Sequence, residues 1–338
     1  NGGYQHLAKN KMSSWGGSYS YTNLAPAFAI IKQRQDYSKS PVYHGADANF
    51  RIKTSKTGML KYYGYYSNNG LAFTTNSIDS LGYLDKFKIH NTNMYHNMAW
   101  KETLTKGWKI SLGVSYTYNT DDIEGGMQNT NKNDVLLSGL EFKKFKVDNR
   151  GNYFNGKLVL EKKLKGLSAL RFGSEYNFSN DKVIYTAYDG NKYPATVKEQ
   201  IKSLFAEGDL YATNDLAVKA GVRFEHSSIL NKANIAPRLS LAYKLGKGTQ
   251  ASLAYGIFYQ NPERRYLPSP NELVFMKATH YIAQFQRSLN QQTLRAELYY
   301  KKYNNLVKTG VVGFTEAAIN NNGFGDAKGF ELFWRDKK

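Results

Sequence analysis

The feature that most restricts the fold of this chain is an apolar residue at every second position, repeated in many segments. In LAVKAGVRFEHS, residues 216–227, one parity carries Leu, Val, Ala, Val and Phe, and the other carries Lys, Gly, Arg, Glu and Ser. The same alternation recurs in ISLGVSYTYN (110–119), LRFGSEYNFS (170–179) and TLRAELYYKK (293–302). Period-two alternation indicates β-strands. We therefore predict an all-β chain of about fifteen strands, each of about ten residues.

The connections between these segments alternate between two lengths. Short turns are predicted at 54–58, 103–107, 164–166, 213–215, 245–249 and 290–292, and long polar loops at 67–86, 120–133, 179–195, 261–277 and 304–326. A meander of this kind gathers its tight turns at one end and its long loops at the other. Outer-membrane barrels have short periplasmic turns and long extracellular loops. The sequence thus predicts a transmembrane antiparallel up-and-down β-barrel with its apolar face in hydrocarbon.

The composition agrees with a barrel wall. Mean hydropathy is only -0.58, which a barrel tolerates because half of each strand can be polar. No apolar run of about 18 residues is present, so we predict no transmembrane helix. Aromatics make up 14% of the chain, and Trp100, Trp108 and Trp334 stand at the turn ends of their segments. Tyr residues stand at the loop ends, as in the two aromatic girdles of a barrel.

The charge balance points to a membrane surface rather than to nucleic acid. Lys and Arg number 46 against 27 Asp and Glu, for a net charge of +19. Many of the lysines, including Lys56, Lys106 and Lys165, lie in or beside the short turns, where they can reach anionic headgroups. No aromatic platform for stacking bases accompanies them. We expect outer-membrane lipids and lipopolysaccharide as partners, and no nucleic acid.

Charged residues on the polar parity can be paired by folding each hairpin about its turn. Around residues 213–215, this register places Asp209 beside Lys219 and Glu207 within diagonal reach of Arg223. Around residues 290–292, Gln284 comes opposite Glu297, and Gln286 opposite Arg295. The lumen-facing polar set predicted in this way is Arg171, Glu175, Glu207, Asp209, Lys219, Arg223, Glu225, Arg295 and Glu297. Stabilisation of the wall is favoured for these residues over contact with a ligand.

The loop NPERRYLPSPNEL, residues 261–273, is the clearest candidate for a contact outside the wall. It gathers Arg264, Arg265 and Tyr266 between prolines, which fits a ligand or partner contact, although an ordinary rigid loop explains it as well. The acidic residues at 121, 122, 124 and 134 are read as a solvated loop rather than a calcium site.

The sequence carries no pattern of an active site. No G-x-S-x-G elbow, phosphate-binding loop or paired-carboxylate motif occurs on a suitable framework. The six histidines lack metal-ligand spacing, and there is no cysteine. We predict neither catalysis nor a cofactor or metal.

Three segments resemble a known family. GVRFEHSSILNKANIAPRLSLAYKLGKGTQASLAYGIFYQNPERRYL (221–267) is similar to the barrel of TonB-dependent outer-membrane receptors, especially the Bacteroidota type. The stretch NNNGFGDAKGFELFWR (320–335) resembles a later part of the same barrel. YTNLAP (21–26), taken with KTSKTGMLKYYGYYS (53–67), resembles an early part.

The resemblance implies a 22-stranded barrel closed around an N-terminal plug in the outer membrane of a Gram-negative bacterium. Such a receptor imports a scarce nutrient, such as a siderophore, haem, cobalamin, glycan or peptide, with energy delivered by TonB. Residues 1–338 would then be a partial barrel, without the plug domain and the C-terminal strands. The implied partners are the TonB complex, through the plug, and a surface lipoprotein.

Two other readings of the sequence stay open. One is an outer-membrane barrel that acts in adhesion, secretion or assembly without transport. The other is a soluble β protein that binds polyanions.

Overall fold

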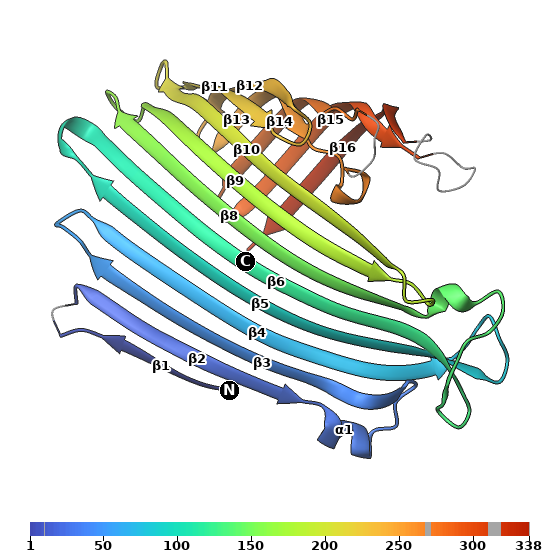
Figure 1. The fold of residues 1–338 in the computed structure, drawn as a ribbon. Coiled ribbons are helices and arrows are strands. Elements are labelled where there is room, and N and C mark those ends of the chain that lie inside the picture. Colours follow the sequence, from blue (N-terminus) through green and yellow to red (C-terminus); the bar gives the residue numbers. More distant parts are fainter. Residues whose placement is uncertain (10, 268–271, 310–318, 338) are drawn as a thin grey trace. The chain divides into compact units, whose positions relative to one another are not determined.

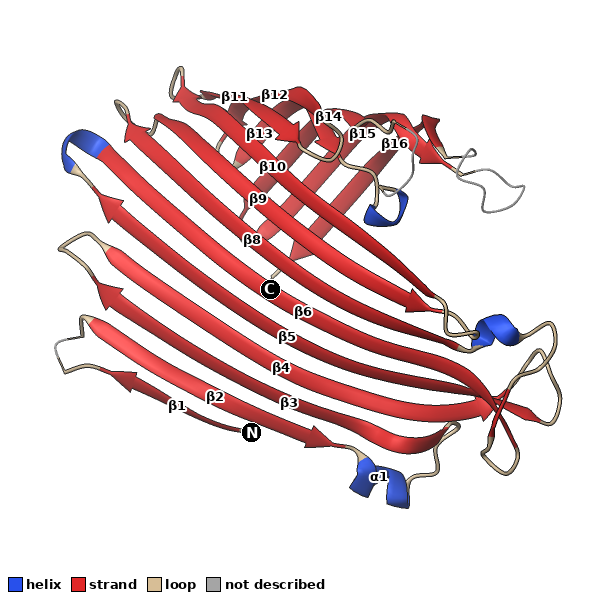
Figure 2. Ribbon diagram, in the orientation of Figure 1, coloured by secondary structure: helices blue, strands red, loops and turns tan. Residues whose placement is uncertain are grey.

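The computed structural model describes residues 1–9, 11–267, 272–309 and 319–337, and most of them lie in β-strands. Short helices occupy some of the connections (Figure 2). Among the described residues, no helix is long and apolar enough to span a membrane. The strands are β1 (Gly2–Leu7), β2 (Ser13–Asn23), β3 (Asp36–Lys53), β4 (Met59–Asn76), β5 (Tyr83–Thr103), β6 (Trp108–Asn129), β7 (Asp134–Val135), β8 (Phe145–Lys163), β9 (Ala169–Thr186), β10 (Lys192–Tyr211), β11 (Leu216–Ser227), β12 (Lys232–Gly246), β13 (Thr249–Gln260), β14 (Met276–Leu289), β15 (Gln292–Lys308) and β16 (Asn320–Asp336); the helices are α1 (Ala25–Ile30), η1 (Thr105–Gly107), η2 (Glu141–Lys143) and η3 (Arg264–Tyr266).

The strands follow one another through the sheet in the order of the sequence. The described part of the chain forms a 16-stranded sheet that runs from β1 to β16, with the two-residue strand β7 paired to β6 off the main path. Figure 1 shows this succession from blue to red. The strands pair in antiparallel register, for example with Val218 opposite Leu241 between β11 and β12. The predicted meander and the predicted strand number are confirmed.

The connections alternate as predicted, because neighbouring antiparallel strands place successive connections at opposite ends. The tight turns join β3 to β4, β8 to β9, β10 to β11, β12 to β13 and β14 to β15. In the β14–β15 turn, Asn290 and Gln291 both have positive φ, of 50° and 65°, as a two-residue hairpin turn requires. In the β12–β13 turn, Gly248 has φ +67°, and a Cβ there would lie 2.2 Å from the Ser288 carbonyl oxygen. Only glycine fits that position.

The predicted strand lengths and four of the predicted loops are wrong. β4 continues to Asn76, β6 to Asn129 and β9 to Thr186, well into the segments expected to be loops. The expected loop 304–326 likewise contains the end of β15 and the start of β16. β6 reaches 22 residues, about twice what a tilted strand needs to cross a bilayer. Beyond the apolar band both faces meet water, so the alternation fades while neighbouring strands keep their hydrogen bonds. Polar stretches such as residues 67–70 therefore resemble loops in sequence.

The two faces of the sheet differ as the alternation predicts, and the large apolar side chains are on the outside. Leu204, Leu253, Leu298 and Phe330 are 58–62% exposed, and the strand registers align residues of this apolar parity across β10 to β16. By contrast, Ser227 is fully buried. Such an inverted distribution is unstable in water and suits a wall whose outer face meets hydrocarbon.

The chain divides into two compact units. One consists of Asn1–Lys101, Gly113–Gly156 and Phe178–Lys198, and the other of Glu102–Leu112, Lys157–Asn177 and Glu199–Lys338. In the first unit, η2 is tied to the β4–β5 connection, since the Lys143 ammonium lies 2.6 Å from an Asp79 carboxylate oxygen and 2.8 Å from Asp85. Hydrogen bonds to Asp79 and then Asp85 raise the pKa of Lys143. The loops at this end are therefore held by ion pairs as well as by their strands.

A charge placed on the apolar face tests its environment. Leu253→Arg is expected to lower the free energy of unfolding by about 2 kcal/mol, because an outward cation in a barrel wall must leave water for lipid. Gln284→Lys is the matched control on the polar face, where the new cation would meet Glu297. Urea unfolding of the protein refolded into lipid vesicles measures both. An equal cost for the two variants would contradict the assignment of faces.

Candidate functional site

The largest ionic network on the polar face gathers around Arg171 of β9. The Arg171 guanidinium donates from Nε to Glu161 Oε2 at 2.8 Å and from Nη1 to Glu207 Oε1 at 3.2 Å, and it also bonds Asp209. Two lysines complete the network. Lys109 lies 3.1 Å from Glu161 Oε1, and Lys219 lies 3.0 Å from Glu207 Oε1. Three cations therefore face three carboxylates.

A second network surrounds Arg223 of β11. The Arg223 side chain donates to Glu225 Oε2 at 3.0 Å, to Ser203 Oγ at 2.8 Å and to Glu175 Oε2 at 3.3 Å. Lys157 lies 3.7 Å from the same Glu175 oxygen. This network also holds equal numbers of cations and carboxylates.

The predicted hairpin registers are largely confirmed. Asp209 pairs with Lys219. Gln284 pairs with Glu297 and donates to it at 3.2 Å, and Gln286 pairs with Arg295. The Arg295 guanidinium lies 5.6 Å from the centre of the Phe333 ring. The expected diagonal contact from Glu207 differs, because Glu207 bonds Arg171 and Lys219 instead.

The balance of charges within the networks decides what they can do. Each guanidinium and carboxylate is already bonded to a partner of opposite sign, and an ion pair removed from water stabilises only when its hydrogen bonds are made. These groups can brace four neighbouring strands, β8 to β11, as well as β6. A ligand would have to displace those bonds to reach them.

Three network residues were missed from the sequence. Glu161 is found by the same hairpin rule, since folding about residues 164–166 brings it opposite Arg171. Lys157 also lies on the polar parity of β8. Lys109 joins from β6, and its partner Glu161 is 52 positions away. No single hairpin reveals that contact.

The proline-containing loop is anchored to the wall by a small apolar core. Leu230, Leu273 and Phe275 are buried together, and Tyr266 packs against them. Of the three candidate contact residues, Tyr266 is therefore part of this core, and Arg264 is exposed in the short helix η3. The side chain of Arg265 lies outside the described residues.

A buried carboxylate fixes the start of the same loop. Glu199, at the loop end of β10, is 7% exposed and accepts hydrogen bonds from the Ser227 hydroxyl at 2.7 Å and from the Asn261 amide. Asn261 also donates to Ser227 Oγ at 3.2 Å. On the far side, the Val274 amide donates to Asn321 Oδ1 at 2.8 Å. The loop is held at both ends by polar contacts.

The acidic residues near position 122 form no cation site. Three of them lie on strand β6 rather than in a loop, and each is engaged with other side chains: Asp122 with Arg150, Glu124 with Lys88, and Asp121 with asparagine amides. Asp134 binds Lys86, and hydrogen bonds from Lys86 and then Gln128 lower the pKa of Asp134. Within the described ranges, no cluster of His, Asp or Glu suits a metal ion.

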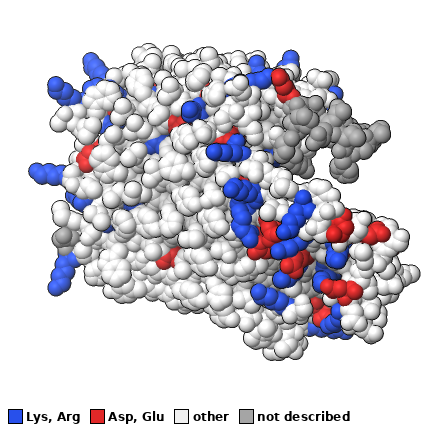
Figure 3. Space-filling model, in the orientation of Figure 1, with Lys and Arg blue, Asp and Glu red and all other residues white. Residues whose placement is uncertain are grey.

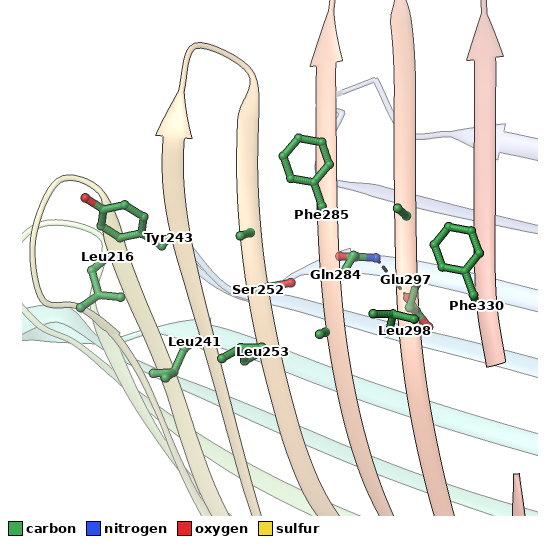
Figure 4. A pocket seen from close by; sticks show the side chains of 13 residues that line it. Leu216, Leu241, Tyr243, Ser252, Leu253, Gln284, Phe285, Glu297, Leu298 and Phe330 are labelled. Carbon is green, nitrogen blue, oxygen red and sulfur yellow. Dashed lines mark hydrogen bonds between the residues drawn. The ribbon is translucent and has the colours of Figure 1, made fainter. Parts of the chain in front are cut away.

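A shallow depression lies on the apolar face of the second unit, between β11 and β16. Tall side chains such as Leu253, Leu298 and Phe330 surround it, and Ala251, Ala283 and Ala296 line it between them. Figure 4 shows these tall side chains on neighbouring strands together with the Gln284–Glu297 hydrogen bond. An apolar depression on this face suits lipid chains rather than a polar nutrient.

The fold and its inverted faces define the class as an outer-membrane β-barrel, and a family comparison identifies the family. A profile described as TonB dependent receptor-like, beta-barrel matches residues 32–335. The chain belongs to this family of TonB-dependent receptors. The family places it in the outer membrane of a Gram-negative bacterium, and its members are receptors and transporters rather than enzymes. The Bacteroidota type stays a prediction.

Solved structures share the fold at low sequence identity. The siderophore receptor PirA of Acinetobacter baumannii is 12% identical with a TM-score of 0.69, covering 98% of this chain and 56% of that one. A mutant ferric enterobactin receptor PfeA of Pseudomonas aeruginosa is 14% identical with a TM-score of 0.69, and the match covers 98% of this chain and 56% of that one. The alcaligin receptor FauA of Bordetella pertussis is 13% identical with a TM-score of 0.65, and the match covers 98% of this chain and 54% of that one. The chain thus spans about half the length of these receptors. No curated protein sequence matches it.

Removing the central guanidinium of the first network should weaken the wall. Arg171→Gln leaves three carboxylates facing two lysines and is expected to cost about 2 kcal/mol of unfolding free energy. Lys219→Gln removes the charge of a side chain that is 53% exposed and should lower the free energy of unfolding by less than about 1 kcal/mol. Urea unfolding in vesicles compares them. A larger cost for the lysine variant would refute the bracing role.

Removing the buried carboxylate should loosen the loop. Glu199→Ala removes the carboxylate that accepts from both Ser227 and Asn261, and we expect faster amide hydrogen exchange across residues 261–267 and 272–275. Glu297→Ala, within the wall, is the control and should leave exchange in this loop unchanged. Unaltered protection in the Glu199 variant would show that the apolar core alone holds the loop.

Proposed function

We propose that this chain forms much of the wall of a TonB-dependent importer that carries a scarce nutrient across the outer membrane. The observation that carries the proposal is the family match over residues 32–335, joined to a sheet whose polar face is braced by bonded ion networks. In a barrel this face lines the lumen, so we assign the nine predicted polar residues there. A plug domain and a 22-stranded closure are parts of the same proposal, as is TonB as the energy source.

The cargo class is a scarce nutrient such as a siderophore, haem, cobalamin, glycan or peptide. The similar receptors are described as receptors for alcaligin, ferric enterobactin and siderophores, which favours a chelated metal among these classes. First contact falls to the loops rather than the wall, because the wall charges are already neutralised by one another. Arg264, exposed in η3 on the anchored loop, is the proposed contact for an anionic cargo, and a surface lipoprotein is the proposed accessory partner.

Uptake in cells tests the proposal against a barrel that serves adhesion, secretion or assembly. Cells that produce the receptor should accumulate one member of a labelled nutrient panel at least about tenfold above cells that lack it, and a protonophore should abolish the difference. For a cargo with negative charge, Arg264→Ala should raise the half-saturating concentration about tenfold, the worth of one charged hydrogen bond. Lys56→Gln, in a turn at the opposite end, is the control.

Accumulation that persists without proton-motive force would reject TonB-driven import. If no nutrient accumulates while cell adhesion or protein secretion is lost with the receptor, the barrel has the other role.

A further inference from the structure

The polar face of the first compact unit differs in composition from the ionic networks described above, which all lie in the second unit. Its odd-numbered positions in 43–49 of β3, 63–69 of β4 and 91–97 of β5 are opposite one another in register. Of these twelve residues, five are Asn, four are Tyr and only Asp47 is charged. The first unit thus presents a nearly uncharged polar wall.

The even-numbered side chains of the same strands face the other way. Ile52, Met94 and Met98 are 38–43% exposed, as expected of side chains that meet hydrocarbon. Figure 3 shows blue and red side chains gathered together near the loop ends, beside a broad uncharged area. In this unit, ion pairs such as Lys86 with Asp134 hold the loop ends, and the polar wall between the strand ends relies on neutral groups.

A ladder of amide side chains makes this polar wall rigid. Asn69 donates to Asn91 Oδ1 at 3.2 Å, and Asn91 donates to Asn119 Oδ1 at 3.1 Å. Asp121 accepts from Asn91 at 2.6 Å and from Asn149 at 3.1 Å. These bonds join β4, β5, β6 and β8, so the wall is ordered before any ligand arrives, which lowers the entropic cost of binding.

Three side chains on the same face form one row across β3, β4 and β5. Asn49 is directly opposite Tyr63, and Tyr63 is opposite Asn97. Tyr63 is 42% exposed, and the centre of its ring lies 6.4 Å from that of Tyr95. Asn97 donates to the Tyr95 hydroxyl at 2.9 Å. Within the described ranges, the Asn49 amide and the Tyr63 hydroxyl have no hydrogen-bond partner, so both can bond a ligand.

An aromatic ring between two amides has the chemistry to bind a neutral sugar. A side-chain amide carries both donors and an acceptor, so it can bond two neighbouring hydroxyl groups of a sugar ring. The C–H face of the sugar can pack on a tyrosine ring, whose hydroxyl bonds at the edge. An anion would find no cation in this row, and the charge of Asp47, two residues from Asn49, would repel it.

We propose that Asn49, Tyr63 and Asn97 form a binding site for a neutral oligosaccharide on the polar face of the first unit. The proposal rests on the importer assignment, because this face meets cargo only where it lines a passage. It selects the glycan among the cargo classes named above, whereas the names of the similar receptors favour a chelated metal. The neighbouring rings of Tyr63 and Tyr95 favour a chain of sugars over a single one.

Isothermal titration calorimetry of the intact receptor tests the site, in a detergent without sugar headgroups and with neutral hexasaccharides of glucose, mannose, galactose and xylose as probes. At least one hexasaccharide should bind with a dissociation constant below about 1 mM. Tyr63→Ala should raise that constant at least about tenfold, as the loss of an aromatic anchor does. Asn49→Leu, which removes the amide and keeps the volume, should raise it about fivefold.

Two further variants separate sugar binding from a structural role. Tyr63→Phe keeps the ring and should leave the dissociation constant within about threefold, because only one hydrogen bond is lost. Tyr66→Ala removes a tyrosine that is 40% exposed on the apolar face of the same strand and should leave binding unchanged. Heat-modifiable gel migration checks that each variant is folded.

Binding of none of the four hexasaccharides would overturn the proposal, and so would equal weakening by Tyr63→Ala and Tyr66→Ala. Calorimetry measures binding without transport, so the two proposals can fail separately. A receptor that accumulates an iron chelate in cells and binds no hexasaccharide keeps the importer assignment and loses the sugar site. A receptor that binds a hexasaccharide through Tyr63 without energy-dependent uptake keeps the site and loses the importer assignment.

Discussion

The structure depends on one constraint: backbone N–H and C=O groups inside hydrocarbon must bond to one another, because no water is there to receive them. An antiparallel sheet meets this need between neighbouring strands. Successive side chains of each strand then point alternately to hydrocarbon and to the polar face, and this explains the alternation of apolar and polar residues in 216–227. The exposed leucines, the bonded polar face and the sequential strand order all follow from it.

The polar face shows how neighbouring strands are tied together without a hydrophobic core. Arg171 and Arg223 each bridge carboxylates from several strands, and the networks contain equal numbers of opposite charges. Bonds of this kind hold the strands in register on the polar face, and the apolar face is left for lipid. The loop at residues 261–275 uses the same strategy on a smaller scale, with Glu199 and an apolar core as its two anchors.

Features that depend on residue parity and on hairpin turns are predictable from the sequence. They include the strand order, the two faces and the Gln284–Glu297 pair, and the position of Glu161 follows from the same hairpin rule. The ends of the strands beyond the membrane are not predictable in this way, because residues 67–76 lose their alternation while they stay paired. Contacts between segments that are distant in sequence, such as Lys109 with Glu161 and Asn261 with Glu199, are not predictable either.

The unexpected length of the strands has a consequence for the outer surface of this protein. A strand of 22 residues extends about 75 Å along its own direction and spans about 55 Å along the membrane normal at the usual tilt, whereas the apolar band of a barrel is about 25 Å tall. Much of the remainder rises on the cell exterior as rigid paired backbone. The loop ends of the longest strands therefore stand clear of the bilayer, and a molecule arriving from the medium meets ordered protein before it reaches any lipid.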